Sequence, residues 1–95
     1  MNERGEPGQT RELIEVKATF SLGKKPPFHE RYSAETSVGT VLEAVRVYFE
    51  AKDEPNVVWY LSARDLRQDN AATLEQIAGG GDEISFRLVK EITQG

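Results

Sequence analysis

SVGTVLEAVRVYFEAK, residues 37–52, has the apolar spacing of a single amphipathic helix. Ser37 suits the N-cap, and Pro55 stops the helix because the residue before a proline is pushed out of the helical region. We therefore predict a helix from about Val38 to Lys52. Its apolar stripe, which must face a sheet, consists of Val38, Val41, Leu42, Val45 and Phe49. The opposite face carries charged residues that can pair on the solvent side, namely Glu43, Arg46 and Glu50.

Two strands are predicted on the N-terminal side of this helix. From Leu13 to Leu22, apolar and polar residues alternate, which places every second side chain on one face of a strand. Residues 23–27, GKKPP, break this pattern as a turn, and residues 28–34 resume it more weakly. The two segments together predict a hairpin with a long, partly rigid turn.

Two further strands are predicted on the C-terminal side. Residues 57–63, VVWYLSA, are short, apolar and rich in β-branched and aromatic residues, as in a buried strand. Trp59 and Leu61 share one face of this strand, and Val58 and Tyr60 share the other.

A short helical turn should precede the last strand. Thr73 and Gln76 have the spacing of a capping box, and residues 79–81, three glycines, end the turn. Residues 82–89 then alternate again, so that Ile84, Phe86 and Leu88 face the core and Ser85, Arg87 and Val89 face outward.

This order of elements resembles that of ubiquitin and its relatives. The resemblance covers about residues 12–89 and is carried by Gly23-Lys24, SVGTVLEAV, WYLSARDL, Thr73-Leu74 and residues 84–88. It implies an α+β, ubiquitin-like β-grasp fold, in which a mixed four- or five-stranded sheet packs on one helix. The first strand is expected to be central and parallel to the last.

We expect three segments along the chain. Residues 1–11 have almost no apolar content and are predicted to be a disordered arm. Residues 12–89 form the β-grasp domain, and residues 90–95 form a flexible tail. The predicted core consists of Ile14, Val16, Phe20, Val41, Val45, Trp59, Leu61, Leu74, Ile84, Phe86 and Leu88.

Composition narrows the classes of function. The chain has 95 residues, no cysteine and a net charge of -4, so it lacks thiol chemistry and repels phosphate backbones. The one basic cluster, Lys24-Lys25 beside two prolines, is predicted to be a solvated loop. No apolar run is long enough to span a bilayer. We expect a soluble, cytoplasmic monomer with no nucleic-acid partner, no membrane contact and no cofactor.

The resemblance also implies a function. In ubiquitin-like modifiers, an activating enzyme adenylates the carboxylate of a terminal glycine, and the acyl group then passes to a thiol and finally to a target. The matching residue here is Gly95, which follows Gln94 where relatives have a second glycine. The protein is then a substrate of activating-like and conjugating-like enzymes and not itself an enzyme. The position that matches the best-known chain-linking lysine of ubiquitin is Arg64.

Two alternatives remain open. The first is a non-covalent interaction module that docks a partner through Val58, Tyr60 and Arg87 on the outer sheet face, and it is favoured by the missing diglycine. The second is a sulfur carrier, which also depends on Gly95. His29 has no second ligand or nucleophile at a useful spacing, so neither a metal site nor acid–base catalysis is expected there.

Overall fold

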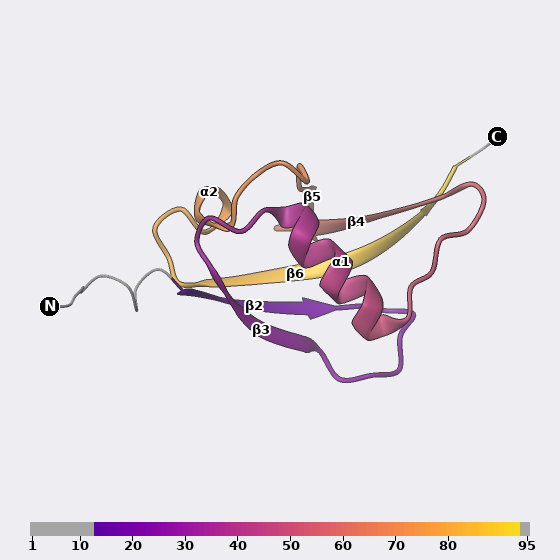
Figure 1. Cartoon of the computed structure of the whole chain (residues 1–95). Coiled ribbons are helices and arrows are strands. Elements are labelled where there is room, and N and C mark those ends of the chain that lie inside the picture. The colour runs from indigo at the N-terminus through magenta and orange to yellow at the C-terminus, as the bar shows by residue number, and fades with distance from the viewer. Residues whose placement is uncertain (1–12, 94–95) are drawn as a thin grey trace, which may run out of the picture.

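The computed structural model describes residues 13–93. Its strands are β2 (Leu13–Thr19), β3 (Phe28–Ser33), β4 (Val57–Ala63), β5 (Leu66–Arg67) and β6 (Glu83–Ile92). Its helices are α1 (Val38–Phe49) and α2 (Leu74–Ala78). The strands form one five-stranded sheet in the order β3-β2-β6-β4-β5 (Figure 1). The predicted α+β fold with a mixed sheet and one main helix is confirmed.

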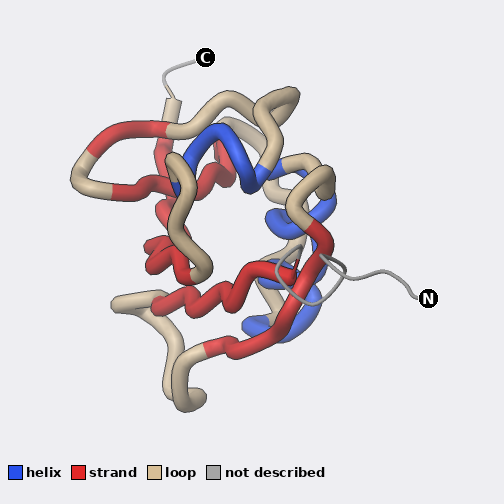
Figure 2. Tube along the Cα trace, turned by 90° about the vertical axis from the view of Figure 1, so that its left-hand side faces the viewer, coloured by secondary structure: helices blue, strands red, loops and turns tan. Residues whose placement is uncertain are grey.

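The sheet combines two hairpins with a central strand. β2 pairs antiparallel with β3 and parallel with β6, and β4 pairs antiparallel with both β6 and β5. The predicted parallel pairing of the first and last strands is therefore confirmed. The first strand lies inside the sheet, between β3 and β6, and β6 takes the middle position between the two hairpins. Figure 2 shows the strands following one another around a curved sheet.

The inner face of the sheet packs against α1. All predicted core residues are buried except Phe20, which lies half-buried at the edge of the core. The Phe20 ring makes edge-to-face contacts with Phe49 and Trp59, with ring centroids 5.6 Å apart in both pairs. The apolar stripe predicted for α1 is buried in full. Further buried apolar residues are Ala18, Phe28, Ala51 and Ala63.

The turn between β2 and β3 begins earlier than predicted. β2 ends at Thr19, because the chain then turns and the amide of Gly23 donates to the Phe20 carbonyl at 3.0 Å. Residues 24–27 are exposed, as predicted for a solvated loop, but Lys25 also contacts α1. Its Nζ donates to the carbonyl of Tyr48 at 2.7 Å, and the Tyr48 hydroxyl donates to the Pro26 carbonyl at 2.9 Å. The loop is thus fastened to the last turn of α1.

The helix α1 ends at Phe49 and not at Lys52 as predicted. Glu50 adopts the left-handed conformation, with φ 59°, and its amide bonds back to the carbonyls of Arg46 and Val47. This cap ends the helix before Pro55 can act on it.

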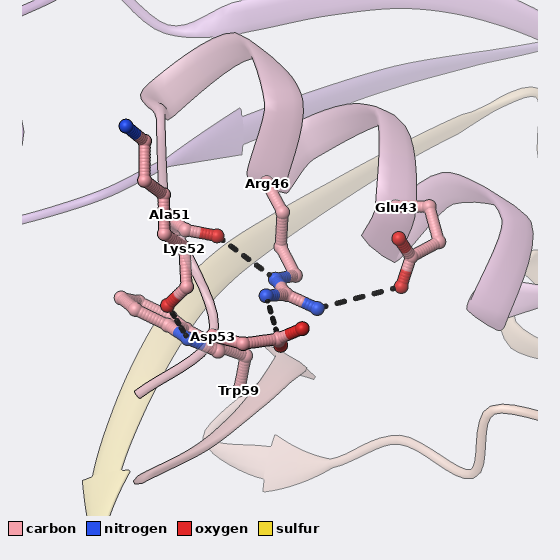
Figure 3. Close-up of polar contacts among 6 residues, drawn as sticks. All are labelled: Glu43, Arg46, Ala51, Lys52, Asp53 and Trp59. Atoms are coloured by element: carbon pink, nitrogen blue, oxygen red, sulfur yellow. Dashed lines mark hydrogen bonds and ion pairs between the residues drawn. The ribbon is translucent and has the colours of Figure 1, made fainter. Parts of the chain in front are cut away.

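Arg46 fastens the segment after α1, contrary to its predicted place on the solvent side (Figure 3). Its Nη1 lies 3.5 Å from Glu43, as predicted, but its Nη2 lies 2.6 Å from Asp53 and its Nε donates to the Ala51 carbonyl at 3.1 Å. Glu50, the other predicted partner, pairs with Lys25 at 3.3 Å instead. These contacts fix the path of the chain from α1 towards β4.

Both predicted helix caps are confirmed. The Ser37 side chain accepts the amide of Thr40, and Thr73 with Gln76 forms a complete capping box at α2. Gly79 ends α2 in the left-handed conformation with φ 59°, as predicted for the glycine run.

The last strand is longer than predicted. Residues 90–92 belong to β6, where Lys90 pairs with Trp59 and Ile92 with Val57, so the boundary placed after Val89 is wrong. The alternation weakens there because Lys90 and Glu91 are both charged, although the strand continues along β4. The predicted arm of residues 1–11 and the residue Gly95 lie outside the described residues.

Candidate protein-interaction surface

The outer face of the sheet carries an apolar patch on the neighbouring strands β4 and β6. Alternation in β4 turns Trp59 and Leu61 inward, which leaves Val58 and Tyr60 on the outer face. In β6 the outward residue directly opposite Tyr60 is Val89. All three outer residues are half-buried. Directly opposed side chains in a sheet lie close enough to touch, so these residues form one surface, which we call the Tyr60 patch.

An arginine from the shortest strand covers one side of this patch. Arg67 lies in β5 opposite Ser62, and its guanidinium is 4.7 Å from the centre of the Tyr60 ring. The same guanidinium is 3.5 Å from the carboxylate of Glu91, which stands opposite Val58. Tyr60 is therefore held between an aliphatic neighbour and a cation, an arrangement that orients the ring without burying it.

The structure brings two of the three predicted surface residues together. Val58 and Tyr60 belong to the Tyr60 patch, whereas Arg87 lies two residues before Val89 in β6, opposite Ser62. Arg87 is 3.8 Å from Asp65 and its side chain is 60% exposed. Arg87 thus marks the border of the patch.

Sequence analysis missed Val89, Arg67 and Glu91 as members of this surface. The outward parity of Val89 was recognised, but its position opposite Tyr60 depends on the register between β4 and β6. Arg67 required β5, a strand of two residues that carries no periodic signal.

A shallow cleft of about 340 Å³ adjoins Arg87 on the same face. Its lining includes Lys17 from β2, Ser85 from β6, and Arg64 and Asp65 from the turn between β4 and β5. Both turn residues have positive φ, 55° and 65°, as a two-residue hairpin with a type I′ turn requires.

His29 lies outside the lining of this cleft and contacts Glu15. Its Nε2 is hydrogen-bonded to the Glu15 carboxylate on the outer face of β2 and β3. In residues 13–93, no three histidine, cysteine, aspartate or glutamate side chains are grouped to hold a metal ion. Over the same residues, neither helix is long and apolar enough to cross a membrane.

Comparisons with known structures decide the fold. Neither the models of known families nor the curated proteins give a match. Among solved structures, the ubiquitin of Caldiarchaeum subterraneum is similar, with a TM-score of 0.67 and 19% identity over 87% of this chain and 99% of that one. The chain has a ubiquitin-like β-grasp fold.

Other ubiquitin-like structures support this assignment. Trypanosoma brucei ATG8 has a TM-score of 0.66 and 11% identity, and the alignment covers 90% of this chain and 78% of that chain. A structure described as molecular mimicry of SUMO that promotes DNA repair has a TM-score of 0.62 and 9% identity, over 82% of this chain and 91% of that one. The low identities fit a divergent sequence on this ubiquitin-like fold.

Proposed function

We propose that this ubiquitin-like protein works by being recognised, and that partner proteins dock on the Tyr60 patch. The observation that carries this proposal is the half-buried Tyr60 ring on the outer sheet face, between Val89 and the guanidinium of Arg67. Tyrosine and arginine are enriched at interfaces because each offers a large contact area together with a polar group. In this role the protein is a binding partner and not a catalyst.

Paired surface variants test this proposal. Tyr60→Ala removes the centre of the patch, while Val47→Ala removes a valine of α1 that is 77% exposed on another part of the surface. A partner captured from the source cells is titrated against each variant by calorimetry. We expect Tyr60→Ala to weaken binding by about tenfold or more, as for a central aromatic residue, and Val47→Ala to leave it unchanged.

The opposite pattern would place the docking surface on α1. Circular dichroism of both variants is the control for retention of the fold. Amide shifts of the labelled protein upon binding should cluster on β4 and β6, and shifts confined to α1 would contradict the proposal.

A second candidate function is that of a protein modifier activated at Gly95. It is supported by the similarity to ubiquitin and by the course of β6, which ends at Ile92, close to Gly95 in the sequence. In this proposal the Gly95 carboxylate attacks ATP and releases pyrophosphate, and the acyl group then passes to an enzyme thiol with release of AMP. Because the reaction consumes ATP, we propose the cytoplasm as its location.

The modifier proposal is tested with a polypeptide that ends at Gly95. The protein is incubated with ATP and an activating enzyme from the same genome, and the adduct is measured by intact mass. The adduct should form with the wild type and be absent after deletion of Gly95. Equal labelling of both would refute the proposal, and a terminal thiocarboxylate would instead indicate a sulfur carrier.

A further inference from the structure

The cleft beside the Tyr60 patch concentrates positive charge in an acidic protein. The chain carries a net charge of -4, yet Lys17, Arg64 and Arg87 gather around one depression of about 340 Å³. Among the described residues, Asp65 is the only carboxylate of the lining, and it lies 3.8 Å from Arg87. Within residues 13–93, Lys17 and Arg64 make no ion pair. The cleft therefore has an excess of cations over anions.

The sheet places these cations from three separate elements. Lys17 of β2 stands opposite Ser85 of β6, and Arg87 of β6 stands opposite Ser62 of β4. The two serines also line the cleft, so hydroxyl donors lie between the charged groups. Donors of this kind suit an anionic ligand.

The turn that carries Arg64 adds a separate observation. Arg64 and Asp65 both hold positive φ, a conformation for which asparagine and glycine are the usual choice in such turns. Residues in sparsely populated conformations cluster at binding sites, where the function of the side chain offsets the cost of backbone strain. Here the unusual residue contributes a guanidinium to the rim of the cleft.

We propose that this cleft binds the acidic side chains of an extended partner segment whose apolar residues cover the Tyr60 patch. The inference rests on the proposed docking function and adds the chemistry of the partner. Val89 and Arg87 are consecutive outward positions of β6, about 7 Å apart. An extended peptide has the same spacing between side chains on one face, so one segment reaches both regions.

A carboxylate-bearing peptide fits this cleft better than a nucleic acid. A phosphate backbone needs a long positive track, whereas the rest of this chain is net negative and repels it. One or two carboxylates match the two arginines, whose planar guanidinium groups bind carboxylates through paired hydrogen bonds.

The proposal is tested by fluorescence anisotropy with a labelled peptide of sequence Gly-Leu-Val-Leu-Glu-Asp-Glu-Asp-Gly. One triple variant carries Lys17→Gln, Arg64→Gln and Arg87→Gln. Its matched control carries Lys24→Gln, Arg31→Gln and Lys52→Gln. These three residues do not line the cleft, and the control has the same net charge as the cleft variant. We expect the cleft variant to lose about tenfold in affinity and the control less than about twofold at physiological salt.

Four outcomes overturn the inference. They are equal losses in both triple variants, no loss in either, no binding of the peptide to the wild type, and tighter binding of a labelled oligothymidylate than of the peptide. A version of the peptide with Gln and Asn in place of Glu and Asp separates this inference from the docking proposal. Tyr60→Ala should weaken both peptides, whereas the cleft variant should weaken only the acidic one. If only Tyr60→Ala has an effect, the docking proposal stands and the acidic specificity is refuted.

Discussion

The guanidinium of Arg67 lies 4.7 Å from the centre of the Tyr60 ring and 3.5 Å from the carboxylate of Glu91. One side chain from a two-residue strand thus holds both the aromatic ring and the acidic border of the outer surface. Because Arg67 is more than half exposed, its contacts contribute little to folding and act mainly on the orientation of Tyr60.

Arg67→Gln is therefore expected to separate binding from stability. The free energy of unfolding should change by less than about 0.5 kcal/mol, as for most surface substitutions. Binding of a partner to the Tyr60 patch should weaken severalfold because the ring loses its cation. Urea unfolding and calorimetric titration measure the two effects. A large loss of stability with unchanged binding would show that Arg67 is a folding residue.

Substitution of Arg46, in contrast, should lower the stability of the protein. Its side chain is only 16% exposed and bonds to the Ala51 carbonyl, while Asp53, its ionic partner, is 95% exposed. Arg46→Met leaves the Ala51 carbonyl without this donor and should destabilise the protein by about 1–2 kcal/mol. Asp53→Asn removes only an exposed charge and should cost less than about 1 kcal/mol.

Trp59 supplies the readout for both variants, because its indole Nε1 donates to the Lys52 carbonyl at 3.1 Å beside this cluster (Figure 3). In urea unfolding followed by tryptophan fluorescence, the free energy of unfolding should be lower for Arg46→Met than for Asp53→Asn. Equal losses would mean that the exposed ion pair, and not the bond to the backbone, provides the stabilisation.

Local patterns predicted the elements and their faces, but not their lengths. Alternation correctly assigned Tyr60 to the outer face and Trp59 to the inner face, since parity is a property of each strand alone. The end of α1 was misplaced because Glu50 adopts a left-handed cap, which its residue type does not signal. The end of β6 was misplaced because pairing with β4, not residue type, decides where that strand stops.

The proposed interaction surface was predictable only in part for the same reason. Val58 and Tyr60 lie on one strand, so their common face follows from the sequence. Val89 joins them through the register of β6, and the cleft combines Lys17 with Arg64, which are far apart in the chain. Such juxtapositions depend on long-range pairing that single-strand patterns do not contain.

Glu50→Gly should stabilise the protein. Glu50 caps α1 at φ 59°, where a Cβ is disfavoured and glycine is the usual residue. The relief of strain, about 1 kcal/mol, exceeds the loss of an exposed ion pair with Lys25. We expect a net gain of about 0.5 kcal/mol in urea unfolding. Lys25→Gln removes this ion pair together with the bond from Lys25 to the Tyr48 carbonyl, so its loss of stability is an upper limit for the ion-pair contribution. A net loss of stability in Glu50→Gly would contradict this explanation of the cap.

Thr73→Ala should destabilise the protein by about 1 kcal/mol through loss of the cap of α2. The Thr73 hydroxyl accepts the amide of Gln76 at 3.3 Å, and the Gln76 side chain accepts the amide of Thr73 at 2.9 Å. Thr73→Ser keeps the hydroxyl and should stay within about 0.5 kcal/mol of the wild type in thermal or urea unfolding. Equal losses in both variants would assign the effect to the methyl group and not to the hydrogen bond.

Tyr32 should make stability depend on alkaline pH. Partial burial, and secondly the nearby charge of Glu30, raise the pKa of Tyr32 above the ordinary tyrosine value of 10.0. Below that value Tyr32 keeps its proton in both the folded and the unfolded state, and its contribution to stability is fully present. As the pH rises above it, the unfolded chain releases the proton first, so the folded state loses stability until the folded pKa is passed.

Tyr32→Phe should remove this pH-dependent part of the stability. Urea unfolding of the two proteins between about pH 9 and pH 11 measures it, since the two proteins share every other titratable group. The free energy of unfolding of the wild type should fall more steeply with pH than that of the variant, and parallel curves would show that Tyr32 titrates alike in the folded and unfolded states.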